Sequence, residues 1–212
     1  MIKGIVFDFD GTIVDSMQMV FNALNDALKK RSLPSIEIEL LGRMAGLPII
    51  DIINAKAHIS ESTAKEIEKD VFEAYTSFCR TRCQLLPHVE STLKILKSKQ
   101  IKLGLLTTTP NKPLQTIVKK FSLEDYFDIM IAKEDAKNKP NPEGLEKIIN
   151  KFGIEKYECL YVGDSPIDIL TGKASGIKTI AVTTGIATIE QLKEAKPDGI
   201  IPNLQKLLVF VD

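Results

Sequence analysis

Two aspartates, Asp8 and Asp10, end an apolar run in the sequence IVFDFDGTIVDS, residues 5–16. The apolar residues favour a buried strand, whereas two carboxylates require water or a cation. A second pair, Asp164 and Asp168, follows another apolar run in YVGDSPID. Carboxylates that meet in one place repel one another unless a cation neutralises them, and their hard oxygen ligands suit Mg²⁺ beside a phosphoryl group. The four aspartates therefore predict a magnesium site for phosphoryl chemistry.

Two further polar residues follow predicted strands. Thr107 ends the run IKLGLLT, and Lys139 follows a weaker apolar run after a short loop, in KNKPNP. The carboxyl ends of strands are where open α/β sheets bind ligands, so both residues are candidates for the same site as the aspartates. The alternatives are a threonine that serves only β-propensity and a lysine exposed on a loop.

The strands and helices that would hold these residues alternate along the chain. Near-continuous apolar runs predict parallel strands buried on both faces, at residues 2–7, 101–107, 159–163 and 178–184, with a weaker strand at 128–132. Amphipathic stretches between them predict helices at residues 88–99, 114–121, 142–152 and 166–175. This alternation indicates an α/β fold with a doubly wound, Rossmann-like parallel sheet.

The long interval between the first two strong strands contains no convincing strand. Its apolar residues recur at helical spacing, in segments at residues 16–30, 40–58 and 60–78. The middle segment is expected to form two shorter helices that divide near Gly46. We therefore expect residues 17–83 to form an inserted, all-helical cap domain, and residues 1–16 together with 84–212 to form the α/β core domain.

The charge balance excludes several classes of partner. The chain of 212 residues has 28 Lys+Arg and 28 Asp+Glu, which gives no electrostatic footprint for nucleic acid or an anionic membrane. No apolar stretch approaches the roughly 18 residues that a membrane span requires. Two carboxylates also interrupt the amino-terminal apolar run, unlike a signal peptide. We expect a soluble, cytoplasmic protein with no nucleic-acid or membrane partner.

The three cysteines, Cys79, Cys83 and Cys159, are too few for a disulfide framework and suit a reducing compartment. Cys79 and Cys83 stand four residues apart and near His88, so a zinc site is conceivable. A fourth ligand is missing, however, and packing is the preferred role.

Four ordered motifs, DFDGTIVDS, LLTTT, NKPNP and VGDSPID, carry a resemblance to a known superfamily. The chain resembles the haloacid-dehalogenase-like (HAD) phosphohydrolases along its whole length, with the spacing of a helical cap after the first motif. It is most similar to the phosphoglycolate phosphatase and beta-phosphoglucomutase-like members. The resemblance implies a Mg²⁺-dependent phosphatase that hydrolyses a small phosphorylated metabolite, of the phosphoglycolate or sugar-phosphate kind, through an aspartyl-phosphate.

The resemblance also implies a role for each aspartate. Asp8 would be the nucleophile. Asp10 would be the general acid that protonates the leaving oxygen, and then the base that activates water. The side chains of Asp8 and Asp164 and the carbonyl of Asp10 would bind Mg²⁺, with Asp168 supporting them through water or hydrogen bonds.

The same resemblance assigns the phosphoryl group to a second set of residues. Thr107 would hydrogen-bond a phosphoryl oxygen, and Lys139 would neutralise charge on the nucleophile and the transferring group. Backbone N–H groups of a tight turn at Gly11 and Thr12 would face the phosphate oxygens, with Thr108 contributing from the second motif.

Other activities remain as alternatives. A phosphomutase of the beta-phosphoglucomutase type shares the chemistry, and Arg43 is the single cap candidate for a second phosphate. A dehalogenase needs neither the metal nor Asp10, and phosphonate hydrolysis needs a cap amine while its relatives lack the second aspartate, so both are disfavoured. A non-catalytic phosphate-binding module is the alternative outside the enzymes, although no motif residue is missing to suggest it.

Overall fold

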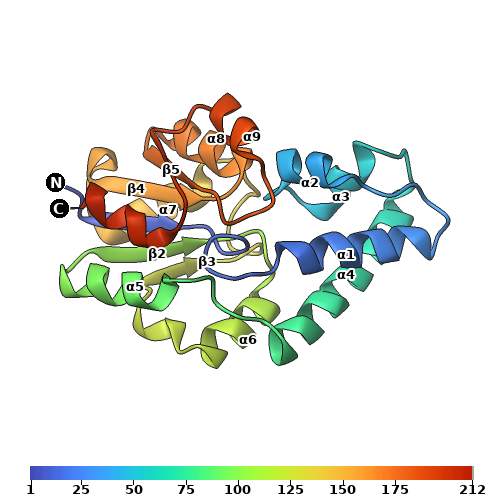
Figure 1. The fold of residues 1–212 in the computed structure, drawn as a ribbon, viewed down its shortest axis with the longest axis horizontal. Coiled ribbons are helices and arrows are strands. Elements are labelled where there is room, and N and C mark those ends of the chain that lie inside the picture. The colour runs from blue at the N-terminus through green and yellow to red at the C-terminus, as the bar shows by residue number, and fades with distance from the viewer. Residues whose placement is uncertain (212) are drawn as a thin grey trace.

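The computed structural model describes residues 1–211 as an α/β fold, in which helices flank a sheet and a further group of helices lies beyond one end of it (Figure 1). The strands are β1 (Gly4–Phe7), β2 (Lys102–Leu106), β3 (Ile129–Ile131), β4 (Cys159–Gly163), β5 (Lys178–Val182) and β6 (Gly199–Ile201). The helices are α1 (Met17–Lys29), α2 (Ile38–Met44), α3 (Ile49–Asn54), α4 (Glu61–Thr81), α5 (Val89–Ser98), α6 (Asn111–Lys120), α7 (Glu143–Phe152), α8 (Pro166–Ser175) and α9 (Ile189–Glu194). Three short 3₁₀ segments are η1 (Leu123–Asp125), η2 (Lys156–Glu158) and η3 (Leu204–Phe210).

The six strands form one parallel sheet in the order β3-β2-β1-β4-β5-β6, which confirms the predicted doubly wound fold. The chain order reverses at β1, whose neighbours are β2 on one side and β4 on the other. Phe7, the last residue of β1, pairs with Leu105 and with Val162. The loops that follow these three strands therefore begin at the same edge of the sheet, at the switch point where such folds bind ligands.

Alternating side chains of β1 fill two separate cores. Ile5 and Phe7 belong to the larger core, which α5, α6 and η3 cover, whereas Val6 belongs to the core that α7 covers on the opposite face. Successive side chains of a strand point to opposite faces, so a sheet covered on both sides needs apolar residues throughout. This double burial explains the unbroken apolar run that precedes Asp8.

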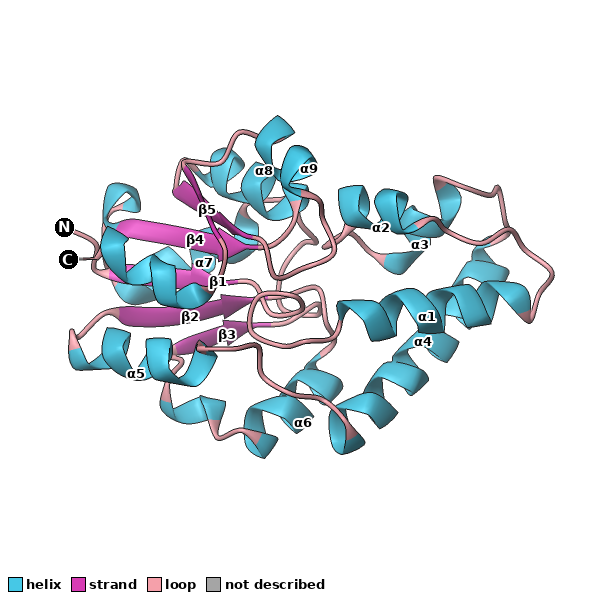
Figure 2. Ribbon diagram, in the orientation of Figure 1, coloured by secondary structure: helices cyan, strands magenta, loops and turns pink. Residues whose placement is uncertain are grey.

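Helices α1 to α4, here called the cap, lie beyond the carboxyl ends of the strands (Figure 2). They share a core of their own, in which α1 and α4 contribute Leu24, Leu28, Ile67 and Val71. Ser60 caps α4, because its side chain accepts a hydrogen bond from the Thr63 N–H at 3.2 Å. The domain boundaries at residues 17 and 83 stay a prediction.

Every predicted strand and helix is present, with ends that differ by a few residues. The predicted division near Gly46 lies between α2 and α3. The carboxy-terminal elements α9, β6 and η3 were not predicted. Helix α9 has only six residues, and the apolar run of β6 is only Ile200 and Ile201 before Pro202. Within residues 1–211, no helix combines the length and the apolar character needed to cross a membrane.

Candidate active site

Lys139 connects two of the four aspartates. Its ammonium forms ion pairs with Asp8 and with Oδ1 of Asp168, the latter at 2.7 Å. All three residues are buried, and Lys139 is only 3% exposed. Lys139, in the loop after β3, thus places a positive charge beside Asp8, which follows β1, and beside Asp168, which lies on the helix after β4. In the sequence, only its position in the motif NKPNP distinguishes Lys139 from the neighbouring loop lysines.

The Asp168 carboxylate is fully occupied by protein donors. Its Oδ1 accepts hydrogen bonds from Lys139 and from the hydroxyl of Tyr161 at 2.7 Å. Its Oδ2 accepts from the backbone N–H of Ser165 at 3.1 Å and from the Ser165 hydroxyl at 2.5 Å. The bond from the Ser165 N–H is part of the capping box that starts α8, in which the Asp168 N–H donates in return to the Ser165 hydroxyl at 3.2 Å. Asp168 therefore orients Lys139 and leaves no free oxygen for another ligand.

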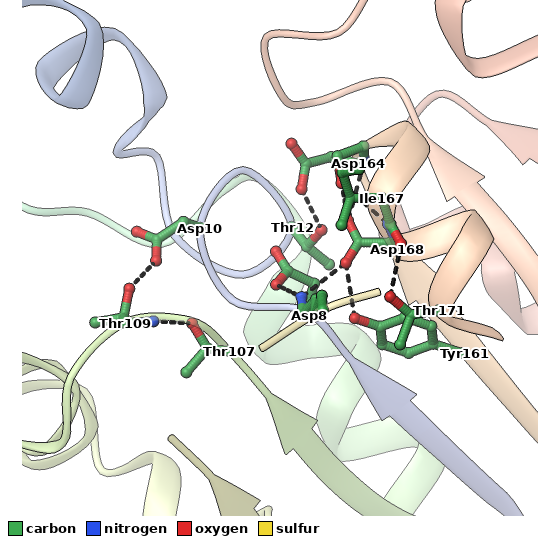
Figure 3. A network of polar contacts seen from close by, with 12 residues as sticks. Asp8, Asp10, Thr12, Thr107, Thr109, Tyr161, Asp164, Ile167, Asp168 and Thr171 are labelled. Carbon is green, nitrogen blue, oxygen red and sulfur yellow. Dashed lines mark hydrogen bonds and ion pairs between the residues drawn. The ribbon is translucent and has the colours of Figure 1, made fainter. Parts of the chain in front are cut away.

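The Asp164 carboxylate has the opposite character, because one of its oxygens has no donor. Oδ1 accepts a hydrogen bond from the Thr12 hydroxyl at 3.0 Å, whereas the buried Oδ2 has no partner among the described residues (Figure 3). A buried carboxylate oxygen without a donor is costly unless a cation neutralises it. A Cβ atom at Gly11 or Gly185 would collide with this carboxylate, so glycines on two loops leave the space around it.

One ligand oxygen each from Asp8, Asp164 and Asp168 lies within 4.8 Å of the others. Among residues 1–211, this is the only group of acidic, histidine or cysteine side chains close enough to share a metal ion. Hard carboxylate oxygens of this kind fit Mg²⁺ better than a softer metal, and those of Asp168 are already occupied. The arrangement therefore fits the magnesium site that the sequence predicts, with Asp8 and Asp164 as the residues that have oxygens to spare.

Burial and mutual repulsion set the ionisation of this cluster. Burial raises the pKa of Asp8 to about 7, against the opposing effect of the Lys139 charge. Burial, followed by the charge of Asp8, raises the pKa of Asp164 well above its usual range. Burial alone would lower the pKa of Lys139, but the charges of Asp168 and Asp8 outweigh it and raise that pKa. A bound cation would offset the repulsion between the acids.

Asp10 lies apart from this cluster and is held by three hydroxyl groups. Its Oδ1 accepts hydrogen bonds from Ser16 at 2.6 Å and from Tyr75 at 2.5 Å. Its Oδ2 accepts from Thr109 at 2.5 Å (Figure 3). Tyr75 comes from α4 in the cap, Ser16 from the start of α1, and Thr109 from the loop after β2. Asp10 therefore lies where the core and the cap meet.

The sequence did not predict these three partners of Asp10. Tyr75 lies within the helical segment predicted at residues 60–78 and Ser16 begins the one at residues 16–30, and neither pattern indicates a contact with Asp10. Thr109 lies in the LLTTT motif, where Thr107 was preferred. Thr107 itself accepts a hydrogen bond from the Thr109 N–H at 3.0 Å, so it orients the loop that holds Asp10.

The backbone N–H groups of the turn after β1 do not face an anion site as the sequence predicts, because they form hydrogen bonds within the turn. The Gly11 N–H donates to the carbonyl of Val14 at 2.8 Å, and the Thr12 N–H donates to that of Phe9 at 3.3 Å. The positive φ of +83° at Gly11 lets the chain close this turn. Within the described residues, the N–H groups of Phe9 and Asp10 donate to no acceptor. The N–H groups without an acceptor are thus those of Phe9 and Asp10, two residues earlier than expected, because the N–H groups of Gly11 and Thr12 donate to carbonyls within the turn.

These residues surround a hollow of about 40 Å³, here called the acidic hollow. Its wall consists of Asp8, Asp10, Met17, Ala45, Gly46, Thr107, Thr108, Asp164, Ser165 and Asp168. Lys139 does not line the hollow but contacts Asp8 and Asp168, which do. Gly11 and Thr12 likewise contact the lining residue Asp164. The structure thus brings together every sequence-predicted site residue at one end of the sheet.

The cysteines lie elsewhere. Cys79, Cys83 and Cys159 are free and buried. Burial raises the pKa of each of these thiols to about 12, so none is a thiolate near neutral pH. Within residues 1–211 they belong to no group that could hold a metal. Packing is the role that remains for them.

A family model described as haloacid dehalogenase-like hydrolase matches residues 5–182. Phosphoglycolate phosphatase of Photorhabdus laumondii is 30% identical over 98% of this chain and 91% of its own. Pyrophosphatase PpaX of Bacillus pumilus is 27% identical over 99% of this chain and 96% of its own. The crystal structure of a predicted phosphoglycolate phosphatase from Haemophilus somnus superposes with a TM-score of 0.84, at 26% identity, over 100% of this chain and 98% of the other.

Proposed function

The chain belongs to the haloacid dehalogenase-like hydrolase family, and we propose that it is a Mg²⁺-dependent phosphatase that cleaves a small phosphate ester through an aspartyl-phosphate. The single observation that carries the proposal is the state of Asp8. Asp8 is 6% exposed and lines the acidic hollow, and its carboxylate accepts one hydrogen bond, from Lys139. The other oxygen is therefore available to attack phosphorus.

The first half of the reaction transfers the phosphoryl group to Asp8. The Asp8 oxygen forms a bond to phosphorus while the bond between phosphorus and the ester oxygen breaks. Asp10 gives its proton to that departing oxygen, which leaves as an alcohol. The Lys139 ammonium stays beside the nucleophile and offsets the negative charge of the transferring group, the stabilisation that phosphoryl transfer most requires.

The second half regenerates the enzyme. Asp10, now ionised, takes a proton from a water molecule that attacks the aspartyl-phosphate, and the bond between Asp8 and phosphorus breaks. Phosphate leaves, and both aspartates return to their starting states. The hydroxyls of Tyr75, Ser16 and Thr109 keep the Asp10 carboxylate in one orientation through both proton transfers.

Several groups would orient the phosphoryl oxygens. They are the side chains of Thr107 and Thr108, which line the acidic hollow, and the backbone N–H groups of Phe9 and Asp10, of which Asp10 lines it. Donors fixed before the substrate arrives need no reorganisation when charge develops. Asp168 contributes indirectly, because it holds the ammonium of Lys139 in position.

The side chains of Asp8 and Asp164 and the carbonyl of Asp10 would hold the magnesium ion. When bound, the ion would neutralise the acidic cluster and the phosphoryl oxygens. The unpartnered Oδ2 of Asp164 supports this assignment, because that oxygen is buried and no donor within residues 1–211 binds it. Asp168 is left out of the direct ligands, since four donors already occupy its oxygens.

The rival functions have less support. A phosphomutase would need a second anion site in the cap, but the guanidinium of Arg43 is bound by Glu194 at 3.0 Å on the exposed surface. Dehalogenase chemistry has no use for Asp10 and its three hydroxyl partners. A non-catalytic phosphate-binding module would not require Asp8, a buried aspartate that keeps one carboxylate oxygen unbonded beside Lys139.

The experiment that tests the proposal is a panel of phosphate monoesters assayed with excess Mg²⁺ and with EDTA. We expect release of inorganic phosphate from at least one small ester and from para-nitrophenyl phosphate, and loss of that activity in EDTA with recovery when Mg²⁺ is restored. Full activity in excess EDTA, or no hydrolysis of any ester in Mg²⁺, contradicts it.

A further inference from the structure

A second, apolar cavity adjoins the acidic hollow on its cap side. It has a volume of about 90 Å³ and shares Asp10, Met17, Ala45, Gly46 and Thr108 with the hollow. Asp10 thus borders both spaces. A phosphoryl group bound at Asp8 would therefore direct its ester oxygen past Asp10 and the rest of its leaving group into this apolar cavity.

The cap supplies most of the cavity wall as hydrocarbon. Six of the residues concerned are Val20, Leu41, Ile49, Ile52, Val71 and Phe72, from α1, α2, α3 and α4. At roughly 10–15 Å³ for each water-sized group, the cavity of about 90 Å³ holds roughly six to nine such groups. The size suits the leaving group of a small metabolite, and the walls offer it dispersion contacts rather than polar partners.

The charged residues of the cavity give it no free cation. Among the described residues that line it, the charged ones are Asp10, Glu68 and Lys133. The Lys133 ammonium is paired with the Glu68 carboxylate at 2.5 Å, and it lies 5.0 Å from the centroid of the Phe72 ring. Apart from Asp10, which carries a proton in the proposed substrate-binding state, the lining therefore carries one carboxylate and one ammonium that neutralise each other.

An anionic leaving group would be poorly received in such a space. It would lose its hydration without gaining a positive partner, because the one ammonium in the lining is already paired. Arg43, the other cation considered for the cap, is not part of the lining and is paired with Glu194. The neutral polar groups of Thr108 and Asn138 can still hydrogen-bond a hydroxyl.

We propose that the substrate is a phosphate monoester of a small, uncharged and largely apolar alcohol, and that esters whose leaving group carries a carboxylate or a second phosphate are discriminated against. This inference rests on the proposed phosphatase function and specifies the substrate class of the same site. It separates the chain from the activities for which the relatives above are named, since the leaving groups of phosphoglycolate and pyrophosphate are both anionic.

The first test compares two esters of matched shape. Isobutyl phosphate and phosphoglycolate have leaving groups with the same number of non-hydrogen atoms, one ending in two methyl groups and the other in a carboxylate. We expect kcat/KM for isobutyl phosphate to be higher by roughly tenfold or more, because burial of an unpaired charge costs at least as much as a mismatched group in an apolar pocket. An equal value, or a preference for phosphoglycolate, overturns the inference.

The second test changes the charge of the cavity through Glu68→Gln. Removing this carboxylate frees the Lys133 ammonium, so the preference for isobutyl phosphate over phosphoglycolate should shrink several-fold. Glu73→Gln is the matched control, because Glu73 lies on the same helix, is exposed, and does not line the cavity. A ratio that stays at the parent value in Glu68→Gln contradicts the assigned role of the pair. A ratio, unlike a single rate, does not change when the variant is merely less active.

Para-nitrophenyl phosphate distinguishes a failure of this inference from a failure of the proposed function. If the parent protein hydrolyses it in Mg²⁺ but prefers phosphoglycolate to isobutyl phosphate, the phosphatase assignment holds and the substrate class is wrong. If it hydrolyses none of the three esters, the proposed function itself is wrong, and the substrate class falls with it.

Discussion

The hydroxyl of Tyr75 donates a hydrogen bond to Oδ1 of Asp10 at 2.5 Å, across the junction between the cap and the core. Tyr75 lies on α4, and Asp10 lies in the loop after β1. Burial, reinforced by the charge of Asp10, raises the pKa of Tyr75 well above its usual range, so the phenol stays protonated and remains a donor. The cap therefore contributes a hydrogen bond directly to the proposed acid–base group.

Tyr75→Phe should slow the step that needs a proton. A single net hydrogen bond is worth about 0.5–1.5 kcal/mol, which corresponds to a loss of roughly twofold to tenfold in kcat/KM for an alkyl phosphate. The loss should be smaller for para-nitrophenyl phosphate, whose leaving group needs little protonation. Tyr157→Phe is the control, because Tyr157 is 71% exposed and lies in η2, which precedes β4, whereas the site lies after the strands. Equal losses on both substrates would point to a general structural defect instead.

Asp8→Asn should abolish turnover without unfolding the protein. The amide has the shape of the carboxylate but is not a nucleophile, so we expect a fall of at least about a thousandfold in kcat and no phosphoenzyme. Circular dichroism and thermal melting should show a folded, cooperative protein. Asp15→Asn is the control at an exposed residue of the same segment. Phosphate release near the parent rate in Asp8→Asn would exclude Asp8 as the nucleophile.

Asp10→Asn should fail at a later step than Asp8→Asn. With para-nitrophenyl phosphate, the variant should still form the aspartyl-phosphate, though slowly, and hydrolyse it very poorly. General acid–base assistance is worth about a hundred- to ten-thousandfold, so the intermediate should accumulate. Mass spectrometry after an acid quench should find one added phosphoryl group on the peptide that contains Asp8.

Two outcomes of that experiment would change the assignments. A phosphoryl group on Thr12 or Ser16 would contradict Asp8 as the nucleophile. Hydrolysis of the aryl ester by Asp10→Asn at the parent rate, with no intermediate, would remove Asp10 from acid–base catalysis and leave only its carbonyl in a proposed role.

Asp164→Asn should remove the response of the protein to Mg²⁺. A ligand that binds only the folded state stabilises it by about 2.7 kcal/mol at a hundredfold excess over its Kd, so Mg²⁺ should raise the melting temperature of the parent protein. The variant should show little rise and require more Mg²⁺ for activity. Its melting temperature without metal should not fall, because the amide replaces a buried carboxylate whose Oδ2 has no partner.

The control for the metal experiment is Asp125→Asn, which alters an exposed acid in η1. It should retain the parent shift in melting temperature with Mg²⁺. An Asp164→Asn variant with the full shift would show that the ion is held without Asp164. The melting experiment measures binding directly and needs no active enzyme.

Local patterns in the sequence were sufficient for the class of fold. Apolar runs and helical periodicity indicate strands and helices because each depends on neighbours a few residues away. They also show that Asp8, Thr107 and Asp164 follow strands. The short β6 was missed because its apolar run consists of Ile200 and Ile201 alone, whereas the equally short β3 lies in a run of four apolar residues, 129–132.

Only the tertiary structure decided which of these residues work together and how. The position of β1 between β2 and β4 brings their loops to one edge, and this order depends on how the whole sheet assembles. The contact of Tyr75 with Asp10 spans 65 positions, and that of Thr109 with Asp10 spans 99.

The division of labour among the acids shows the same limit. In the sequence, Asp164 and Asp168 are two similar carboxylates one helical turn apart, whereas in the fold Asp168 is saturated by donors and Asp164 keeps an empty oxygen. The neutralised pair of Lys133 and Glu68 is likewise invisible in the sequence, because its members are 65 positions apart on the core and the cap. The sequence by itself determined the chemistry of the groups, and the packing of distant segments decided their partners, because hydrogen bonds and charge pairs depend on distances that only the complete fold sets.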